Sequence, residues 1–174
     1  ASLIASGQVT KVICSFPRSA GSVVFPALYR AGKIDLEVVP QGTLAERLRA
    51  AGSGIPAFYT PTSVGTSLAN GKDTRDFDGR TYVMERWLPA DIALIKADVA
   101  DTHGNLTYNM TARNFAPVMC MAATTTIVQA RELVNPGDIN PEMVVTPGIF
   151  VDRVIHIPNP EHEDDLIRAG RSYP

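Results

Sequence analysis

The sequence contains few of the residues that build disulfide or metal sites. Its 174 residues include two cysteines, three histidines and one tryptophan. Two cysteines cannot form the disulfide framework of a small secreted domain, and the three histidines have no metal-ligand spacing. We therefore expect no metal site, and we expect Cys14 and Cys120 to be small buried hydrophobic residues.

The chain also lacks long apolar runs and a strong excess of charge. No apolar run approaches the roughly 20 residues that a membrane-spanning helix needs. Its 16 basic and 18 acidic residues give a net charge of −2, which predicts no basic surface for nucleic acid or anionic lipid. Since the sequence also shows no start methionine and no signal peptide, we expect a cytoplasmic protein that binds neither nucleic acid nor membrane.

What is present is typical of an α/β domain. Of the residues, 45% are hydrophobic and 20% are charged, enough to bury a core in one globular domain. Strand-like runs at residues 11–16 and 36–39 alternate with helical patterns at residues 22–33 and from Thr43 onward. This alternation predicts parallel strands joined by right-handed helical crossovers.

The stretch from Val38 to Thr66 predicts a helix and a candidate site residue. Thr43 is predicted to cap a helix, with Glu46 three residues later completing a capping box, and the helix is predicted to end in the glycines at 52–54. Gln41 then lies between the carboxyl end of a strand and the amino end of a helix. Open α/β sheets bind ligands at such positions, so Gln41 is a candidate site residue.

After Pro61 the regular alternation ends. Asp78 and Gly79 predict a β-hairpin turn between two alternating runs. The remaining predicted elements are a strand at 91–97, a loop at 111–115, a helix at 117–123, a strand at 124–134 and two short strands within 143–157. Residues 158–174 are polar and are predicted to be a mobile or partner-docked tail.

Four segments carry a resemblance to a known family. In chain order they are PQGTLAER, GIPAFYTPT, GNLTYNMTARNFAPV and TPGIFVDRVI. They resemble the A (alpha) subunit of the family I coenzyme A transferases, the 3-oxoacid and 3-oxoadipate CoA-transferases, and the resemblance covers roughly Lys11 to Val154. It implies a mostly parallel open α/β sheet with flanking helices and a β-hairpin insertion, in a single A-subunit domain over residues 1–157.

Two segments of that family are absent from this sequence. One is the glycine-rich GGFxxxGxP segment, so we expect the amino-terminal part of the family domain to be missing here. The other is the SENG-type segment with the nucleophilic glutamate, which the resemblance assigns to a partner B subunit. No catalytic residue is therefore expected in this chain, and the carboxylates of Glu46, Glu85, Asp98 and Glu132 are interpreted as solvated or capping charges.

The resemblance implies transfer of coenzyme A from an acyl-CoA, succinyl-CoA being favoured, to a 3-oxo acid such as 3-oxoadipate or acetoacetate. The intermediate would be a glutamyl-CoA thioester on the B subunit of a hetero-oligomer. No cofactor is expected, because the coenzyme A thioester is itself a substrate. The segment ADVADTHGN and residues 108–110 depart from the frequent family pattern, which leaves the acceptor acid open.

Four substrate-binding residues are predicted. The amide of Gln41 can hold a carboxylate or acyl oxygen, and the resemblance places this glutamine facing the acyl substrate. Phe16 and Arg18 follow the first strand, where the forked guanidinium of Arg18 suits the distal carboxylate of a dicarboxylate. Tyr59 ends the next strand and is predicted to form a pocket wall. The alternatives are that Gln41 only orders its own turn, that Arg18 is solvated and that Tyr59 is ordinary core.

Three other functions stay open from the sequence. The chain could be a subunit of an acetate or short-chain fatty acid CoA-transferase. It could be a ligand-binding α/β domain without turnover. A sugar-phosphate isomerase-like enzyme would share the topology, but it would need its own acid and base.

Overall fold

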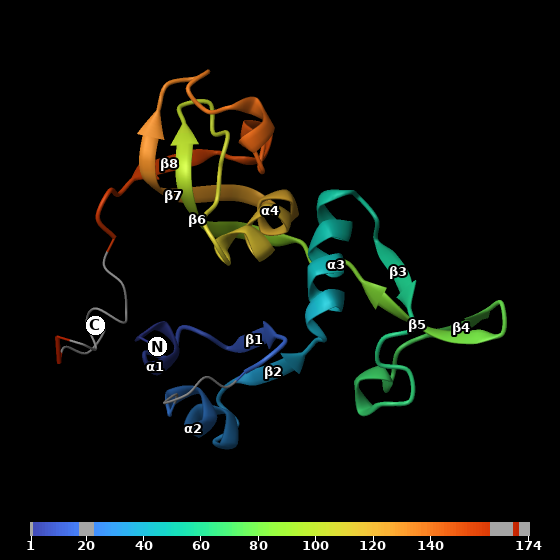
Figure 1. Ribbon diagram of the computed structural model, residues 1–174. Coiled ribbons are helices and arrows are strands. Elements are labelled where there is room, and N and C mark those ends of the chain that lie inside the picture. Colours follow the sequence, from blue (N-terminus) through green and yellow to red (C-terminus); the bar gives the residue numbers. More distant parts are fainter. Residues whose placement is uncertain (1, 18–22, 161–168, 171–174) are drawn as a thin grey trace. The chain divides into compact units, whose positions relative to one another are not determined.

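A computed structural model describes residues 2–17, 23–160 and 169–170 of the chain (Figure 1). Helices and strands alternate up to β3, after which strands predominate. The elements are α1 (Ser2–Ala5), β1 (Lys11–Cys14), α2 (Val24–Arg30), β2 (Asp35–Val38), α3 (Gln41–Gly52), β3 (Ala57–Thr60), β4 (Thr74–Phe77), β5 (Arg80–Arg86), β6 (Ala90–Asp101), α4 (Ala112–Ala122), β7 (Ala123–Val134) and β8 (Arg153–His156), with short 3-10 helices at Ser67–Ala69, Pro141–Met143 and Gly148–Phe150.

The described residues divide into two compact units. The first comprises those within Ala1–Leu44, Pro61–Val83 and Glu161–Pro174, and the second comprises Ala45–Thr60 and Met84–Pro160. Helix α3 and strand β5 contribute residues to both units. The single domain over residues 1–157 with a separate tail stays a prediction.

The first unit contains a short parallel sheet. Strands β1 and β2 pair from Lys11 with Asp35 to Cys14 with Val38, and α2 lies between them in the sequence. This confirms the predicted strand–helix–strand pattern. The buried hydrophobic residues of this unit lie outside the two strands and include Phe25, Ile34 and Val39.

The predicted hairpin is confirmed in the first unit. Strands β4 and β5 pair antiparallel from Thr74 with Val83 to Phe77 with Arg80. The two residues of the turn, Asp78 and Gly79, have φ angles of 51° and 76°. Both angles lie in the left-handed region that a type I′ hairpin turn requires, which explains the Asp-Gly pair. Strand β5 lies between β3 and β4 in a three-stranded sheet.

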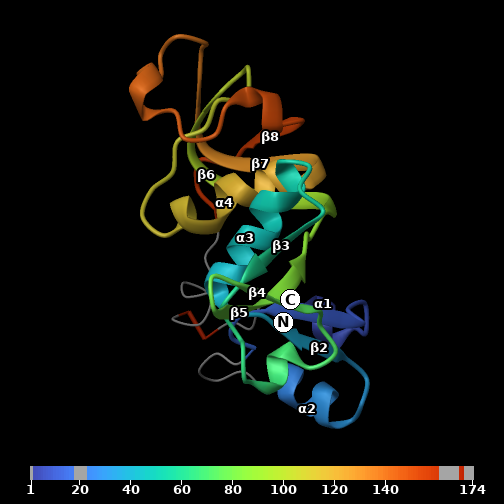
Figure 2. The ribbon, with the colours of Figure 1, turned by 90° about the vertical axis from the view of Figure 1, so that its right-hand side faces the viewer.

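The second unit contains the larger parallel sheet, in the order β6-β7-β8. Strand β7 pairs with β6 from Ala90 with Ala123 to Asp101 with Val134, and it pairs with β8 over Ile127–Ala130. Helix α4 packs against β6 and β7 (Figures 1 and 2). The core between them is formed by Ala93, Ile95, Ala97, Ala100, Leu106, Ala116, Cys120, Val128 and Ala130.

Three predicted elements need correction. Helix α3 begins at Gln41 and not after a cap at Thr43, because Leu44 N–H donates to Pro40 O at 2.8 Å and so closes the first turn three residues earlier. The predicted loop at 111–115 is mostly helical, since α4 begins at Ala112 and tolerates Pro117 in its interior. Residues 143–157 contain one strand, β8, because Thr146 forms only an isolated bridge with Leu106.

The carboxyl end of α3 packs closely on α4 within the second unit. A methyl group added at Gly52 would lie 2.8 Å from the carbonyl oxygen of Met121. That separation is shorter than a side-chain carbon allows, so glycine permits the approach of the two helices. Among the residues that the structure describes, no helix has the length and apolar character needed to cross a membrane.

Candidate functional site

The first unit brings two of the predicted site residues to one sheet edge. Strands β1 and β2 are parallel and end together, because Cys14 pairs with Val38 and Val39 N–H donates to Cys14 O at 3.0 Å. Phe16 follows β1 by two residues and Gln41 follows β2 by three. Both are exposed, Phe16 with 79% of its surface accessible. This carboxyl edge is where parallel α/β sheets bind ligands.

Gln41 occupies the first position of α3 rather than a loop before it. The first turn of an α-helix presents N–H groups that have no acceptor inside the helix, and it carries partial positive charge. The side-chain amide of Gln41 therefore lies beside further hydrogen-bond donors that suit a carboxylate or acyl oxygen. A methyl group added at the neighbouring Gly42 would meet no atom within 4 Å, so the helix start is open.

The predicted capping pair of α3 has other roles. Thr43 is buried inside the first helical turn with 5% of its surface exposed. Glu46 accepts hydrogen bonds from Arg49 Nε at 2.9 Å and Arg49 Nη2 at 2.6 Å. These bonds outweigh the small effect of burial and lower the pKa of Glu46 below its ordinary value. The capping box is therefore wrong, and Glu46 instead forms an ion pair on the helix surface.

Two of the predicted site residues, Arg18 and Tyr59, are not located at this sheet edge by the structure. Arg18 lies outside the described residues, so its role stays a prediction. Tyr59 is partly buried in β3, which belongs to the second unit, and its part in a pocket with Gln41 also stays a prediction.

The carboxylates that we interpreted as solvated or capping charges differ in their surroundings. Asp98 Oδ1 accepts from Arg131 Nε at 2.7 Å, and Glu132 lies 3.8 Å from the same guanidinium. Glu85 contradicts the interpretation, since only 2% of its surface is exposed. The alternation along β5 explains this, because Glu85 lies two residues after the fully buried Val83 and shares its face.

A buried carboxylate that the sequence analysis missed lies at the end of β6. Asp101 accepts hydrogen bonds from the N–H groups of His103 and Asn105 and from Asn105 Nδ2, at 2.8–3.0 Å. Burial raises the pKa of Asp101, but these bonds outweigh it and the pKa falls below its ordinary value. Asn105 Oδ1 in turn accepts from Gly148 N–H at 3.0 Å. The network orders the turn after β6.

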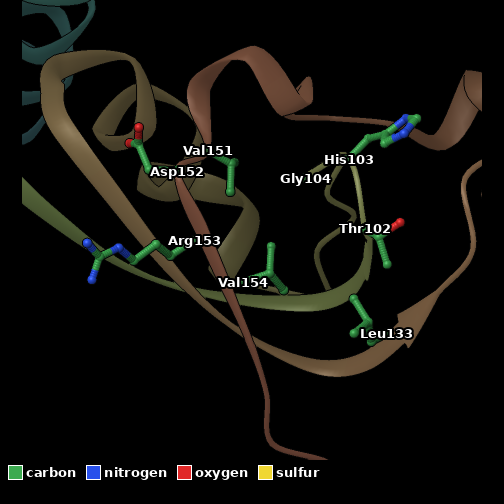
Figure 3. Close-up of a pocket in the computed structure, with 8 residues that line it drawn as sticks. All are labelled: Thr102, His103, Gly104, Leu133, Val151, Asp152, Arg153 and Val154. Carbon is green, nitrogen blue, oxygen red and sulfur yellow. The ribbon is translucent and has the colours of Figure 1, made fainter.

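That turn borders a small pocket of about 250 Å³ in the second unit. Its lining residues are Thr102, His103, Gly104, Leu133, Val151, Asp152, Arg153 and Val154 (Figure 3). The side chains of His103 and Arg153 point away from one another. Asp152 Oδ2 already accepts a hydrogen bond from Thr126 N–H at 2.7 Å. The pocket lacks convergent polar groups and is smaller than a typical ligand site, so we do not assign the acyl substrate to it.

The prediction of buried cysteines is confirmed for Cys120 and is wrong for Cys14, which is only partly buried in β1. Both are free, and Cys120, a residue of α4, is part of the buried core. Burial raises the pKa of its thiol. Burial likewise raises the pKa of Tyr108, whose hydroxyl lies 2.7 Å from Thr146 Oγ1. Among the described residues, no group of three or more His, Cys, Asp and Glu side chains could hold a metal ion.

Comparison with known proteins places this geometry in a family. The sequence profile of the family described as coenzyme A transferase matches residues 1–156. The A subunit of the 3-oxoadipate CoA-transferase of Pseudomonas putida is 60% identical over 157 residues, which are 90% of this chain and 68% of that protein. The A subunit of a probable succinyl-CoA:3-ketoacid coenzyme A transferase of Bacillus subtilis is 48% identical, over 88% of this chain and 63% of its own length.

A solved structure shares the fold. The acyl-CoA transferase of Escherichia coli O157:H7, in a thioester complex with coenzyme A, superposes with a TM-score of 0.78 at 24% sequence identity. The match covers 91% of this chain but 36% of that protein. The chain thus spans about two thirds of the two relatives named above and about a third of this transferase.

Proposed function

The chain belongs to the coenzyme A transferase family, and on that premise we propose that it is the A subunit of an enzyme that moves coenzyme A to a 3-oxo acid. The resemblance of its four sequence segments to family I A subunits is confirmed by this membership. The acyl-CoA donor is proposed to be succinyl-CoA, and the acceptor to be 3-oxoadipate or acetoacetate. Coenzyme A enters as a substrate thioester, and no separate cofactor is proposed.

One observation carries the proposal. The A subunit named for 3-oxoadipate transfer in Pseudomonas putida is 60% identical to this chain over a 157-residue match. The relatives from Pseudomonas putida and Bacillus subtilis are both named as A subunits, so we propose a hetero-oligomer with a B subunit. The B subunit would supply the glutamate that carries coenzyme A as a thioester.

The proposed role of this chain is to bind and orient the acyl group. Acyl transfer passes through a tetrahedral species whose oxygen gains negative charge. The side-chain amide of Gln41, at the exposed start of α3, can donate to that oxygen without changing its own charge. The adjacent N–H groups of the first helical turn favour the same charge. Phe16, exposed at the same sheet edge, offers an apolar surface for the acyl chain.

The direct test is reconstitution with a B subunit. We expect the purified chain alone to transfer no coenzyme A and the A/B complex to do so with ping-pong kinetics from succinyl-CoA. Acetoacetate, 3-oxoadipate, acetate and butyrate should be compared as acceptors. Preference for acetate or butyrate would mean that the acceptor is a short-chain acid and not a 3-oxo acid. Turnover by the isolated chain at the rate of the complex would contradict the assignment of the nucleophile to the B subunit.

We also propose the cytoplasm as the compartment. A chain with two cysteines has too few for the disulfide framework typical of small secreted domains. Measurement of free thiols in the protein purified from its natural host, with rapid alkylation at lysis, would test this.

A further inference from the structure

Helix α3 carries a buried arginine that the proposed reaction does not yet use. Arg47 has 8% of its surface exposed and lies six residues after Gln41 in the same helix. Arginine is rarely buried, because removing its charge from water costs free energy that an apolar side chain would not lose. A buried guanidinium at this position therefore needs a specific explanation.

The contacts of Arg47 give that explanation. Its Nε–H donates to the carbonyl oxygen of Arg86 at 2.8 Å, and its own carbonyl oxygen accepts from Leu88 N–H at 2.9 Å. One residue of α3 thus binds the same short segment, residues 86–88, through both its side chain and its backbone. Trp87 N–H, in that segment, donates to Pro56 O after the helix at 3.1 Å. The two bonds of Arg47 hold one face of α3 against residues 86–88 and so constrain the rotation of the helix about its axis.

The rotation of α3 about its axis determines the direction of its first residue, Gln41. An α-helix is a rigid rod over one or two turns, and six residues span about 9 Å along its axis. Whatever sets the rotation of α3 at Arg47 also sets the direction in which Gln41 leaves the helix. We propose that Arg47 is a positioning residue for Gln41, acting through α3; this inference rests on the proposed function.

A second arginine on the same helix provides a matched control. Arg49 forms its ion pair with Glu46 and a longer bond to Ser53 Oγ, all within or next to α3. Its side chain is 43% exposed. It has the same charge and a similar position to Arg47, but these bonds do not reach residues 86–88. Removing it should leave the rotation of the helix unchanged.

The test is a double-mutant cycle in the A/B complex. We expect Arg47→Met to lower kcat on the order of 10-fold, because misplacing a catalytic contact by a fraction of an ångström has effects of this size. The KM for succinyl-CoA should stay within about twofold. Arg47→Lys should recover part of the loss, and Arg49→Met should change kcat less than about twofold. In a Gln41→Ala background, Arg47→Met should lower kcat little further.

Equal losses from Arg47→Met with and without the Gln41 amide would overturn the inference, because Arg47 would then not act through Gln41. If Arg47→Met does not fold, Arg47→Lys supplies the same cycle. Hydrogen exchange at Leu44 N–H, which closes the first turn of α3, gives a reading without activity. It should accelerate in Arg47→Met and not in Arg49→Met, and unchanged exchange would contradict the anchoring of the helix. If the wild-type complex transfers no coenzyme A, the proposed function fails while this measurement still judges Arg47.

Discussion

The two parallel sheets in the described part of the chain differ in strand length and in burial. Strands β1 and β2 of the first unit have four residues each, and none of these residues is buried. Strands β6 and β7 of the second unit have twelve residues each and bury alternate positions against α4. A short sheet with little burial gains little stability from its own strands.

The candidate binding residues at the β1–β2 edge and the contiguous hydrophobic core lie in different units. Gln41 and Phe16, the candidate site residues that the structure brings together, follow the lightly packed strands β1 and β2. The contiguous core with Leu106 and Val128 lies in the other unit. We therefore expect substitutions at the β1–β2 edge to change turnover with little change in the free energy of unfolding, and core substitutions in the second unit to do the opposite. Four predictions test this.

The largest expected effect is on the core of the second unit. Leu106→Ala removes a fully buried side chain and should lower the free energy of unfolding by about 4 kcal/mol. Leu94→Ala, on β6 but 73% exposed, is the control and should change it by less than about 0.5 kcal/mol. Urea unfolding followed by circular dichroism gives both values. Similar losses in the two variants would show that this core does not dominate stability.

At the sheet edge of the first unit, Gln41→Ala in the A/B complex should lower kcat on the order of 100-fold, the size expected for one donor to a developing oxyanion. The free energy of unfolding should change by no more than about 1 kcal/mol. Gln8→Ala, an exposed glutamine outside this edge, is the control. A higher KM with unchanged kcat would mean that the amide binds only the ground state. A lower melting temperature with unchanged kcat/KM would make Gln41 structural.

The turn after β6 should make the second unit sensitive to acid. The folded chain lowers the pKa of Asp101, so the folded state binds fewer protons and the stabilisation is complete above the ordinary pKa of about 3.9. It should be lost as the pH falls through the lower pKa of the folded state. Asp101→Asn should therefore cost about 2 kcal/mol at pH 7, and its difference from wild type should shrink toward pH 3. A difference that is independent of pH would exclude this titration.

The smallest predicted effect concerns Arg18. If its guanidinium holds a distal carboxylate, Arg18→Ala should raise KM for 3-oxoadipate on the order of 10-fold. The KM for acetoacetate should change little, because this acid has no second carboxylate. Arg30→Ala, in the last turn of α2, serves as a control for general loss of charge. Equal changes for both acids would identify Arg18 as an ordinary surface residue.

Local sequence signals predicted much of the first unit. The β-branched strand runs, the Asp78-Gly79 pair and the place of Gln41 after β2 all depend on residues adjacent in the chain, and the structure agrees with each. The predicted start of α3 was wrong by three residues, because Thr43 and Glu46 have the spacing of a capping box in the sequence. Only the Leu44 N–H bond to Pro40 distinguishes the two starts.

The second unit was harder to predict, because its decisive contacts join distant residues. Asn105 bonds Gly148 across 43 positions, and Arg47 bonds Arg86 across 39. No periodicity or capping pattern records such pairs. The burial of Asp101 and Glu85 was missed for a different reason, because carboxylates are usually exposed, although Glu85 follows the alternation along β5 and Asp101 bonds residues two and four positions away. Pro117 also favoured a helix start, since proline suits the first turn. Tertiary packing against β6 instead places it inside α4.

The two glycines of α3 have opposite consequences for variation in the sequence. In a library that carries every amino acid at each position, Gly42 should accept many replacements in a growth selection for a folded protein, since a side chain there enters open space. Gly52, ten residues along the same helix, should accept almost none, because its neighbour is the backbone of Met121 and backbone cannot rotate aside. A selection for catalysis should then reject at Gly42 the large residues that selection for folding accepts, and the size at which rejection begins would measure the room that the substrate leaves beside Gln41.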